Sequence, residues 1–535
     1  MHSKNLVSSN SIISYSILEI IENYIHQKPI LDSVSLCKFL KSFFNIEITE
    51  DQDIVCGFSS DWSNMLGKAD MLARPSNELQ CSILLYICNY YKIFVTISAG
   101  KTNLTGSATP NGGLIISMVN MLTPNTNVNV NEKNVTVPIG AVLEDVRNDV
   151  LLQSNNTLYY PVNPTSRKEA LIGGTISCNA SGFIPGDKGA TRFWVNGLDL
   201  LLANGQKISA KRGEYESVNS KFFIESEDGV KTEIKVPNYK RPKIKNASGP
   251  FTADKNEIDF IDLIIGSEGC FGLITKAQLN LSDKPKNYME LFIPFDSETD
   301  AIEFYDYICK VNNIENFSAF EYFGYNCQNY MKHNDYFFEN KNSVGIYMQY
   351  PLFNYSIESA VDEWYNIIKN SNVKIDIDKI ISLNDAKNWE IFFEARHSIP
   401  TKALEKTKEL NAISMITDTI VPSSNFKEFL DYTHLLLNDN NIEYLLFGHL
   451  GDCHLHFHLI YDKSEIAMID KIYRKIIKKS SELDGVYSAE HGTGKRKTID
   501  LIECYGEKAV EQIKDCKLGF DPNLILNKGN MVSYD

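Results

Sequence analysis

Two short segments concentrate the histidines of this chain. GHLGDCHLHFH, at 448–458, and SAEHGTGKRK, at 488–497, together hold half of the ten histidines. Imidazole is the commonest metal ligand in proteins and the usual proton carrier near neutral pH. The grouping predicts a site for metal binding or proton transfer.

The first segment alternates histidine with apolar residues, as a strand does. Side chains at i, i+2 and i+4 of a strand share one face, so His454, His456 and His458 would project together while the leucine and phenylalanine residues between them face a core. A turn after Gly448 could bring His449 to the same place.

The second segment adds a carboxylate, Glu490, and another imidazole, His491. Two histidines and one glutamate are a recognised ligand set for a catalytic divalent ion with an open coordination position. The alternative is a polar strand face whose histidines are solvated.

Four glycine-rich stretches lie earlier in the chain, at 98–113, 163–182, 187–195 and 264–275. Glycines and small residues let backbone amides approach an anion closely, as in a pyrophosphate cradle. Neither GxxxxGK[ST] nor GxGxxG occurs in the first stretch, which taken alone could be an ordinary flexible loop. Four such stretches in one region indicate a long ligand lying against several backbone segments.

Composition limits the classes of protein. A chain of 535 residues implies more than one domain. The net charge of −15 and the lack of a basic cluster argue against nucleic-acid binding. Eleven cysteines without a CxxC pair are typical of reduced thiols, and we find no signal peptide or membrane-spanning run. We therefore expect a cytoplasmic protein, with peripheral membrane contact and a homodimer both open.

Apolar periodicity predicts mixed helix and sheet. Residues 1–50 have helical spacing, and a helix at 77–90 should lead into a strand at 93–97. Beyond 284, strands such as Met289–Ile293 alternate with helices such as Glu298–Val311, which favours an α+β domain. Further predictions are the strands Gly345–Tyr350 and Met415–Pro422 and the helices Ile357–Asn370, Trp389–Lys406 and Gly506–Lys514.

The motifs together resemble a known family. IGGTISCNASG, KGATRFWVNGLDLLLANG and DLIIGSEGCFGLIT are similar to the flavin-binding domain of the vanillyl-alcohol oxidase type. The two histidine segments, followed by FDPNLILNKGNM, resemble the C-terminal domain of the FAD-linked oxidases, found in D-lactate, glycolate and D-2-hydroxyglutarate dehydrogenases. The resemblance covers about 70–532.

This resemblance implies an α+β fold: a two-subdomain flavin domain with an α+β, ferredoxin-like cap. The expected divisions are an N-terminal helical extension at 1–50, the FAD-binding domain at 51–283, the cap with the metal site at 284–490, and a segment at 491–535 that returns to the flavin.

The resemblance also assigns roles to residues. His449, His456 and Glu490 would bind a divalent metal, with zinc favoured over manganese or iron, and His491 would be the general base. Arg396 would hold the carboxylate of a D-2-hydroxy acid, which loses a hydride to the flavin and becomes a 2-oxo acid. The electron acceptor, a quinone, a cytochrome or an electron-transfer flavoprotein, is left open.

The expected FAD-binding residues come from all four glycine-rich stretches and the C-terminal segment. They are Ser98, Ala99, Gly100, Lys101, Thr102, Asn103, Gly106, Ser107, Pro164, Thr165, Gly173, Gly174, Asn179, Ser181, Gly182, Thr191, Glu268, Gly272, Ile274 and Asn527. No histidine occurs between His26 and His333, which excludes a histidyl bond to flavin in this domain. Cys178 is expected to be a small packing residue, so we predict non-covalent FAD.

Several positions depart from the family pattern. GDGNLHxN is GDCHLHFH here, which places histidine at 454 and 458 and cysteine at 453. His458 could join the metal shell or face the substrate, and His454 could support a ligand or be an ordinary buried histidine. Asp418 matches the TDxxVP pattern, but the lysine that 2-hydroxyglutarate enzymes carry two residues earlier is Ile416.

This favours a D-lactate-like monocarboxylate. The alternatives are a D-2-hydroxyglutarate dehydrogenase, an inactive binding member of the family, and an ether-lipid synthase of the same superfamily. We see no distinct histidine-run pattern that would support the synthase.

Overall fold

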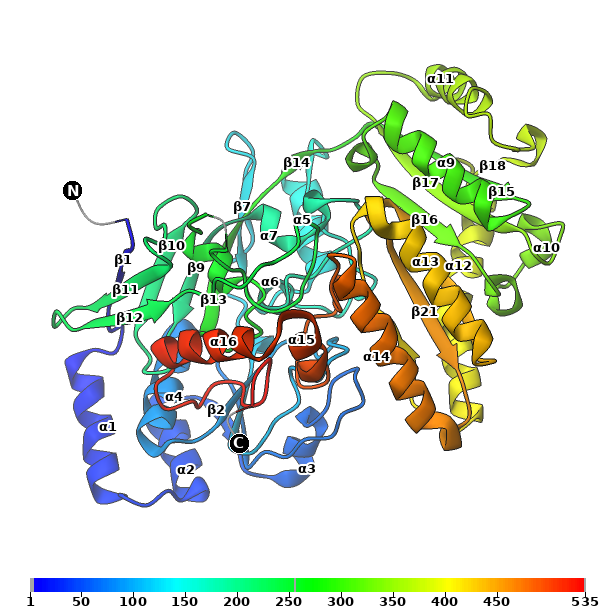
Figure 1. The fold of residues 1–535 in the computed structure, drawn as a ribbon. Coiled ribbons are helices and arrows are strands. Elements are labelled where there is room, and N and C mark those ends of the chain that lie inside the picture. The colour runs from blue at the N-terminus through cyan, green and yellow to red at the C-terminus, as the bar shows by residue number, and fades with distance from the viewer. Residues whose placement is uncertain (1–3, 255, 534–535) are drawn as a thin grey trace.

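The computed structural model describes residues 4–254 and 256–533. Two regions lie side by side in Figure 1, a flavin-type region that holds both ends of the chain and a cap built on one large sheet. The cap has cores of its own, separate from the large core of the first region. The expected α+β architecture, with a vanillyl-alcohol oxidase type flavin domain and an α+β cap, is confirmed.

A four-stranded sheet in the order β2-β3-β5-β4 forms one half of the flavin-type region. Its strands are β2 (Glu47–Thr49), β3 (Met71–Arg74), β5 (Leu114–Ser117) and β4 (Val95–Ser98), and both β3 and β4 pair with β5 in parallel. Helix α4 (Glu78–Tyr91) joins β3 to β4, as a parallel crossover requires. The expected helix at 77–90 and the strand after it are therefore present.

The C-terminal segment closes the outer edge of this sheet. The N–H of Val95 donates to the carbonyl of Ile525 at 2.7 Å, and the N–H of Asn527 donates back to Val95 at 2.7 Å. The Asn527 side chain also accepts from the N–H of Ile97 at 2.9 Å. Backbone groups of β4 that would otherwise be unpaired are thus satisfied by residues from the far end of the chain.

The other half is an antiparallel sheet in the order β10-β9-β13-β7-β6. Its strands are β6 (Asn127–Asn129), β7 (Asn134–Pro138), β9 (Val195–Leu201), β10 (Lys207–Lys211) and β13 (Leu273–Asn280). Beside it lies a three-stranded sheet of β1 (Leu6–Ser9), β11 (Lys221–Ser226) and β12 (Lys231–Lys235). The glycine-rich stretches connect elements of these sheets.

Short elements and the N-terminal helices complete the flavin-type region. Helices α1 (Tyr15–Gln27) and α2 (Ser33–Phe44) contribute apolar residues to its core, as their spacing predicted. The remaining elements are α3 (Gln52–Val55), α5 (Leu143–Gln153), β8 (Leu158–Tyr159), α6 (Ile172–Ser177), α7 (Thr191–Trp194), α8 (Phe260–Ile264) and β14 (Ser282–Asp283).

The cap is a seven-stranded antiparallel sheet in the order β18-β15-β17-β16-β20-β21-β19. Its strands are β15 (Asn287–Phe295), β16 (Ala319–Phe323), β17 (Val344–Leu352), β18 (Ile381–Ser382), β19 (Met415–Ile416), β20 (Glu443–His449) and β21 (His454–Ile460). The strand expected at Met415–Pro422 is shorter, because regular pairing with β21 ends at Ile416. Thr417 instead turns its carbonyl toward a histidine of the site.

Helices cover both faces of the cap sheet. Helices α9 (Glu298–Val311), α11 (Ile357–Lys369), α13 (Ser423–Asp439) and α14 (Ile466–Glu482) share one core with Leu455, Phe457 and Leu459 of β21. Helix α12 (Ala386–Glu409), with the short α10 (Asn334–Phe337), forms a second core. The alternation along β21 therefore turns its histidines away from the first core, as predicted.

The chain then returns to the flavin-type region through α15 (Thr498–Tyr505) and α16 (Glu507–Phe520). Phe520 stacks on Phe271 with ring centroids 5.0 Å apart, and α16 packs against β12. No helix in the described part of the chain is both long enough and apolar enough to cross a membrane.

Candidate metal and flavin site

A tight hairpin between β20 and β21 brings three imidazoles together, those of His449, His454 and His456. His449 pairs directly with His454, and Gly448 pairs with Leu455. Gly448 has a φ of +144°, and a Cβ there would lie 2.9 Å from the His454 carbonyl oxygen, so this position requires glycine. The predicted turn thus places His449 beside the face that carries His454 and His456.

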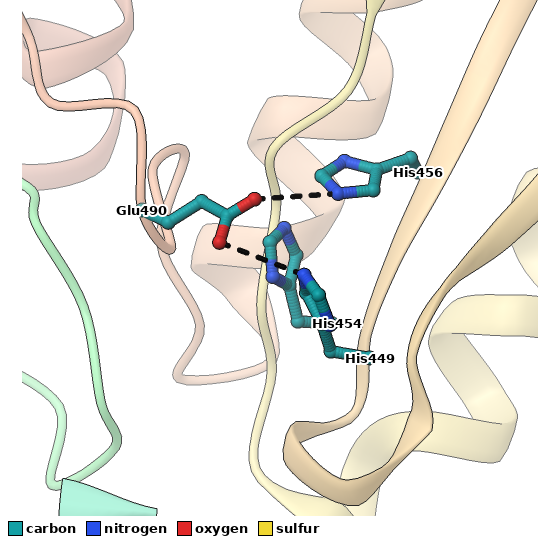
Figure 2. Close-up of side chains that lie close together, drawn as sticks. All are labelled: His449, His454, His456 and Glu490. Atoms are coloured by element: carbon teal, nitrogen blue, oxygen red, sulfur yellow. Dashed lines mark ion pairs between the residues drawn. The ribbon is translucent and has the colours of Figure 1, made fainter. Parts of the chain in front are cut away.

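The loop of Glu490 meets this hairpin from the C-terminal segment. His449, His454, His456 and Glu490 each offer a ligand atom, and these atoms all lie within 4.8 Å of one another. The Nε2 atoms of His449 and His456 lie 3.6 Å and 3.5 Å from the two carboxylate oxygens of Glu490, as Figure 2 shows. The three expected metal ligands are therefore adjacent.

The hydrogen bonds made by Nδ1 of His449 and His456 indicate that these side chains suit the binding of a cation through Nε2. His456 Nδ1 donates to the Thr417 carbonyl at 3.0 Å, and His449 Nδ1 donates to Glu321 Oε1 at 2.6 Å. With a proton on Nδ1, each ring can offer Nε2, which faces Glu490, as a ligand atom. Metal-binding histidines are held in the same way, by a hydrogen bond from the nitrogen that does not bind the ion.

The pKa of His449 supports this interpretation. Burial lowers it, but the carboxylates of Glu321 and Glu490 outweigh burial and raise it to about 10. The negative charge around His449 therefore favours a cation at Nε2, either a proton or a divalent metal ion. Zinc accepts two imidazoles and one carboxylate and retains an open position.

His454 lies inside this group. Its ring is buried, and burial followed by His456 lowers its pKa to about 4, so the imidazole is neutral. Its Nε2 is 3.2 Å from Asp418 Oδ1 but makes no hydrogen bond. The structure thus offers a fourth nitrogen beside the three expected ligands.

His458 lies apart from the cluster. It is fully buried, its Nε2 is 3.4 Å from Thr407 Oγ1 of α12, and its Nδ1 has no hydrogen-bond partner. It belongs neither to the group of converging ligand atoms nor to the lining of the cavity described below.

Asp418 fixes the loop that carries Glu490 and His491. Its buried carboxylate accepts from the backbone N–H groups of Glu490 at 3.2 Å and His491 at 3.1 Å, and from Lys497 Nζ at 2.7 Å. Burial raises its pKa, but His491 and Lys497 outweigh burial and hold the pKa well below its usual range. The carboxylate is therefore ionised and oriented.

His491 stands between two carboxylates. Its Nδ1 is 3.5 Å from Asp418 Oδ2, its Nε2 is 3.5 Å from Glu490 Oε1, and its ring stacks on His456 with an interplanar angle of 6°. The side chain remains partly exposed on the cavity. This placement suits a proton acceptor next to a metal-bound group.

Arg396 is also at the cavity, on helix α12. Its Nη2 donates to Glu321 Oε2 at 2.9 Å, and its guanidinium lies over the Phe183 ring at 4.4 Å from the centroid. Glu321 therefore contacts both Arg396 and His449. Glu321 could not be identified from the sequence, because no motif surrounds it.

One cavity of about 1200 Å³ connects these side chains with the glycine-rich stretches. Typical ligand pockets have about 300–1,000 Å³, so this cavity has room for a large cofactor together with a substrate. Sixteen of the expected FAD-binding residues line it; Ser98, Gly106, Asn179 and Thr191 do not.

Two of those four have local roles instead. The Thr191 hydroxyl donates to the Ala180 carbonyl at 2.8 Å, and the Asn179 side chain contacts the backbone of Arg192 and Asn246. These bonds shape the second and third glycine-rich stretches. In turn, Trp62, Asn64 and Cys178 line the cavity without having been predicted as binding residues.

The first glycine-rich stretch has free donors on the cavity. Within the described residues, the backbone N–H groups of Gly100, Lys101 and Thr102 have no backbone acceptor, and Lys101 has a φ of +56°. The Ser181 hydroxyl is buried in the cavity wall without a partner. Successive free amides and a free hydroxyl are what a pyrophosphate needs, so the residues present fit FAD.

Comparison with known proteins agrees with this geometry. Residues 69–211 match the FAD binding domain, and residues 352–531 match the C-terminal domain of FAD linked oxidases. The chain thus belongs to the FAD-linked oxidases, a family of flavin-dependent oxidoreductases, as its motifs indicated.

Similar proteins span nearly the whole chain. A D-lactate dehydrogenase of Anaerostipes hadrus is 26% identical over 91% of this chain and 93% of its own. Glycolate oxidase subunit GlcD of Bacillus subtilis is 26% identical over 87% and 89%, and a D-2-hydroxyglutarate dehydrogenase of Xanthomonas citri is 26% identical over 89% and 92%. A solved alkyldihydroxyacetonephosphate synthase shares the fold, with a TM-score of 0.65 and 15% identity over 95% of this chain and 86% of its own.

Proposed function

We propose that this protein is an FAD- and divalent-metal-dependent dehydrogenase that oxidises a D-2-hydroxy acid of the D-lactate type to the 2-oxo acid. The observation that carries the proposal is the convergence of His449 Nε2, His456 Nε2 and Glu490 beside His491, in the cavity that the glycine-rich stretches line. Zinc is favoured because imidazole and carboxylate ligands with an open position suit it, with manganese or iron as alternatives.

The residues of the chain divide the work between binding and proton transfer. His449, His456 and Glu490 would hold the ion, which when bound would lower the pKa of a 2-hydroxyl group. Arg396 would orient the carboxylate through its guanidinium, which offers paired donors. His491 Nε2 would take the hydroxyl proton, while Asp418 stabilises the resulting imidazolium from the Nδ1 side. FAD supplies the hydride acceptor.

A D-2-hydroxyglutarate dehydrogenase is the second candidate, since one relative with that name is as similar as the D-lactate dehydrogenase. Ile416 argues against it, because an apolar side chain lines the cavity where those enzymes are expected to carry a lysine. Turnover of the two acids, with and without a chelator, separates the candidates.

We further propose that FAD is held without a covalent bond. Cys178 is the one cysteine on the cavity among the described residues, and burial raises the pKa of its thiol to about 12, which keeps it protonated and unreactive. Acid precipitation should leave all yellow colour in the supernatant, and colour retained on the pellet would contradict the proposal.

Anaerobic reduction of the flavin tests the main proposal. The purified protein should be yellow, D-lactate should bleach it, and L-lactate should not. Replacing His491 with asparagine should slow bleaching by about 100- to 10,000-fold, the usual contribution of a general base, without removing metal or flavin. A metal-loaded yellow protein that no 2-hydroxy acid bleaches would rule the proposal out.

A further inference from the structure

The cavity continues beyond the histidines into a region with an apolar wall. This distal wall consists of Leu404, Ala412, Ile413, Met415, Ile416 and Ile499. Leu404 lies on the last turns of α12, 412–416 lead into and form β19, and Ile499 begins α15. Ile416 pairs with His458, two residues along β21 from His456, so the wall starts next to the expected metal ligands.

Three side chains of this wall are exposed. Ile413 is 61% exposed, Ile499 53% and Leu404 41%. Apolar groups gathered on one cavity lower the free energy when a hydrocarbon covers them, because water is released from both surfaces.

Charged side chains of both signs line the cavity near the wall. Arg474 pairs with Asp470 at 2.9 Å, and Arg496 Nη2 donates to the Ser414 carbonyl at 3.1 Å. Asp500 also lines this part of the cavity, and burial raises its pKa to about 6. Lys408 also lines the cavity and is exposed. None of these charged side chains belongs to the distal wall itself, where Ile416 stands at the position at which 2-hydroxyglutarate enzymes are expected to carry a lysine.

We propose that the distal wall is a subsite for an apolar side chain, and that the substrate is a D-2-hydroxy acid with an aliphatic side chain longer than the methyl group of lactate. This inference rests on the proposed function. Arg396 and the metal site would hold the carboxylate and hydroxyl groups that all such acids share. The alkyl chain would extend along Ile416 and Ile413 toward Leu404 and Ile499.

A series of D-2-hydroxy acids of increasing chain length tests this subsite. D-lactate, D-2-hydroxybutyrate, D-2-hydroxyhexanoate and D-2-hydroxyglutarate would be compared by kcat/KM for anaerobic flavin bleaching. Each buried methylene should raise kcat/KM roughly fourfold, so the hexanoate should exceed D-lactate by roughly 10- to 60-fold. D-2-hydroxyglutarate should be the poorest of the four.

Single substitutions test whether the dependence of kcat/KM on chain length arises at the distal wall. Ile413→Ser should reduce the hexanoate-to-lactate ratio of kcat/KM by roughly fourfold or more. Leu435→Ser is the matched control, because Leu435 is equally exposed, at 61%, but lies on α13 and away from the cavity. It should leave the ratio unchanged.

Calorimetric binding of the product acids gives a readout that needs no turnover. 2-Oxohexanoate should bind the oxidised protein more tightly than pyruvate and with a more negative heat-capacity change, and Ile413→Ser should remove both differences.

The outcomes separate this inference from the proposed function. If no acid of any length bleaches the flavin, the function itself fails and the subsite with it. If D-lactate bleaches as well as the hexanoate, the function stands and the subsite is wrong. If a short-chain quinone competes with the acids while chain length has no effect, the wall serves an electron acceptor and the inference is also wrong.

Discussion

Glu321 lies between His449 and Arg396, accepting from His449 Nδ1 at 2.6 Å through one oxygen and from Arg396 Nη2 at 2.9 Å through the other. Burial raises the pKa of Glu321, but these two partners outweigh burial and lower it, so the carboxylate is ionised. One buried charge therefore orients both an expected metal ligand and the expected substrate-binding guanidinium.

Replacing Glu321 with glutamine should weaken metal binding by about 10- to 100-fold, the usual cost of losing the group that orients a ligating histidine. At saturating metal, KM for the acid should rise by a smaller factor than the metal dissociation constant. The neutral glutamine no longer offsets the positive charge of Arg396, which attracts the substrate carboxylate. Competition with a chelator measures the first effect, and steady-state kinetics measures the second.

The control for this variant is Glu290→Gln on β15. Glu290 also lies in the cap sheet and accepts from Tyr347 Oη at 2.9 Å, but it does not touch the histidines. It should bind metal normally. Equal metal affinity in the Glu321 variant and the wild type would show that Glu321 does not orient the ligand.

His458→Asn should retain one metal ion per chain, whereas His456→Asn should lose it. His458 contacts Thr407 instead of the converging ligand atoms, and burial followed by His456 lowers its pKa to about 4. The smaller asparagine should cost about 1–2 kcal/mol of stability through lost packing. Metal analysis after dialysis measures the metal content of each variant. A folded His458 variant without metal would show that His458 is one of the metal ligands.

Lys245 and Asp452 form a buried ion pair between the flavin-type region and the turn that follows His449, with side chains 3% and 5% exposed. Asp452 also accepts from the Gly186 N–H at 2.7 Å. Replacing Lys245 with methionine leaves a buried carboxylate unpaired, which should cost about 3–5 kcal/mol and lower the midpoint of thermal unfolding.

The double change Lys245→Met with Asp452→Asn should recover part of that loss. Lys133→Met is the matched control, because Lys133 and Asp283 form a pair at 2.7 Å with half or more of each side chain exposed, and such pairs contribute about 0–1 kcal/mol. A similar midpoint for both single variants would mean that the Lys245 pair does not stabilise the fold.

Asp500 should make stability depend on pH. Burial raises its pKa from 3.8 to about 6, against the opposing effects of Lys497 and Arg474. Between about pH 4 and 6, the Asp500 carboxyl is ionised in the unfolded chain but still protonated in the folded chain. The free energy of unfolding therefore falls as the pH rises through this range. The total decrease in the free energy of unfolding is up to roughly 3 kcal/mol.

Asp500→Asn lacks this ionisation. The thermal midpoint of the variant relative to the wild type should rise between pH 4 and 6 and then level off. Taking the difference between the two proteins cancels the titration of all other groups. A difference that stays constant from pH 4 to 7 would contradict the raised pKa.

The histidine hairpin was predictable because strand alternation and a glycine turn are local properties of the sequence. Sharing a face did not bring all three histidines into the group of converging ligand atoms, however. Residues two apart in a strand are separated by about 6.6 Å, which brings His454 and His456 to the cluster and leaves His458 beyond it. The contribution of Glu490 and His491 followed from family resemblance, since separation along the chain says nothing about contact.

Long-range partners could not be predicted from any single segment. Glu321 precedes His449 by 128 residues and stands in a strand with no motif, and Lys245 reaches Asp452 across 207 residues. The glycine-rich stretches were recognisable from their glycines, and most of the residues expected to bind FAD line the cavity, but the sequence did not distinguish the few that do not. Thr191 and Asn179 show this, because their polar groups bond to neighbouring backbone instead.

The edge of β4 is completed by Ile525 and Asn527, and the Asn527 side chain reaches Ile97 across 430 residues of chain. A ribosome adding roughly 5–20 residues per second delivers that partner some 20 s or more after β4 has emerged. During translation, β4 therefore has an unpaired edge until Ile525 and Asn527 have been synthesised. We therefore expect stable flavin binding to follow the synthesis of this segment, so that a nascent chain halted before residue 525 should carry no yellow colour.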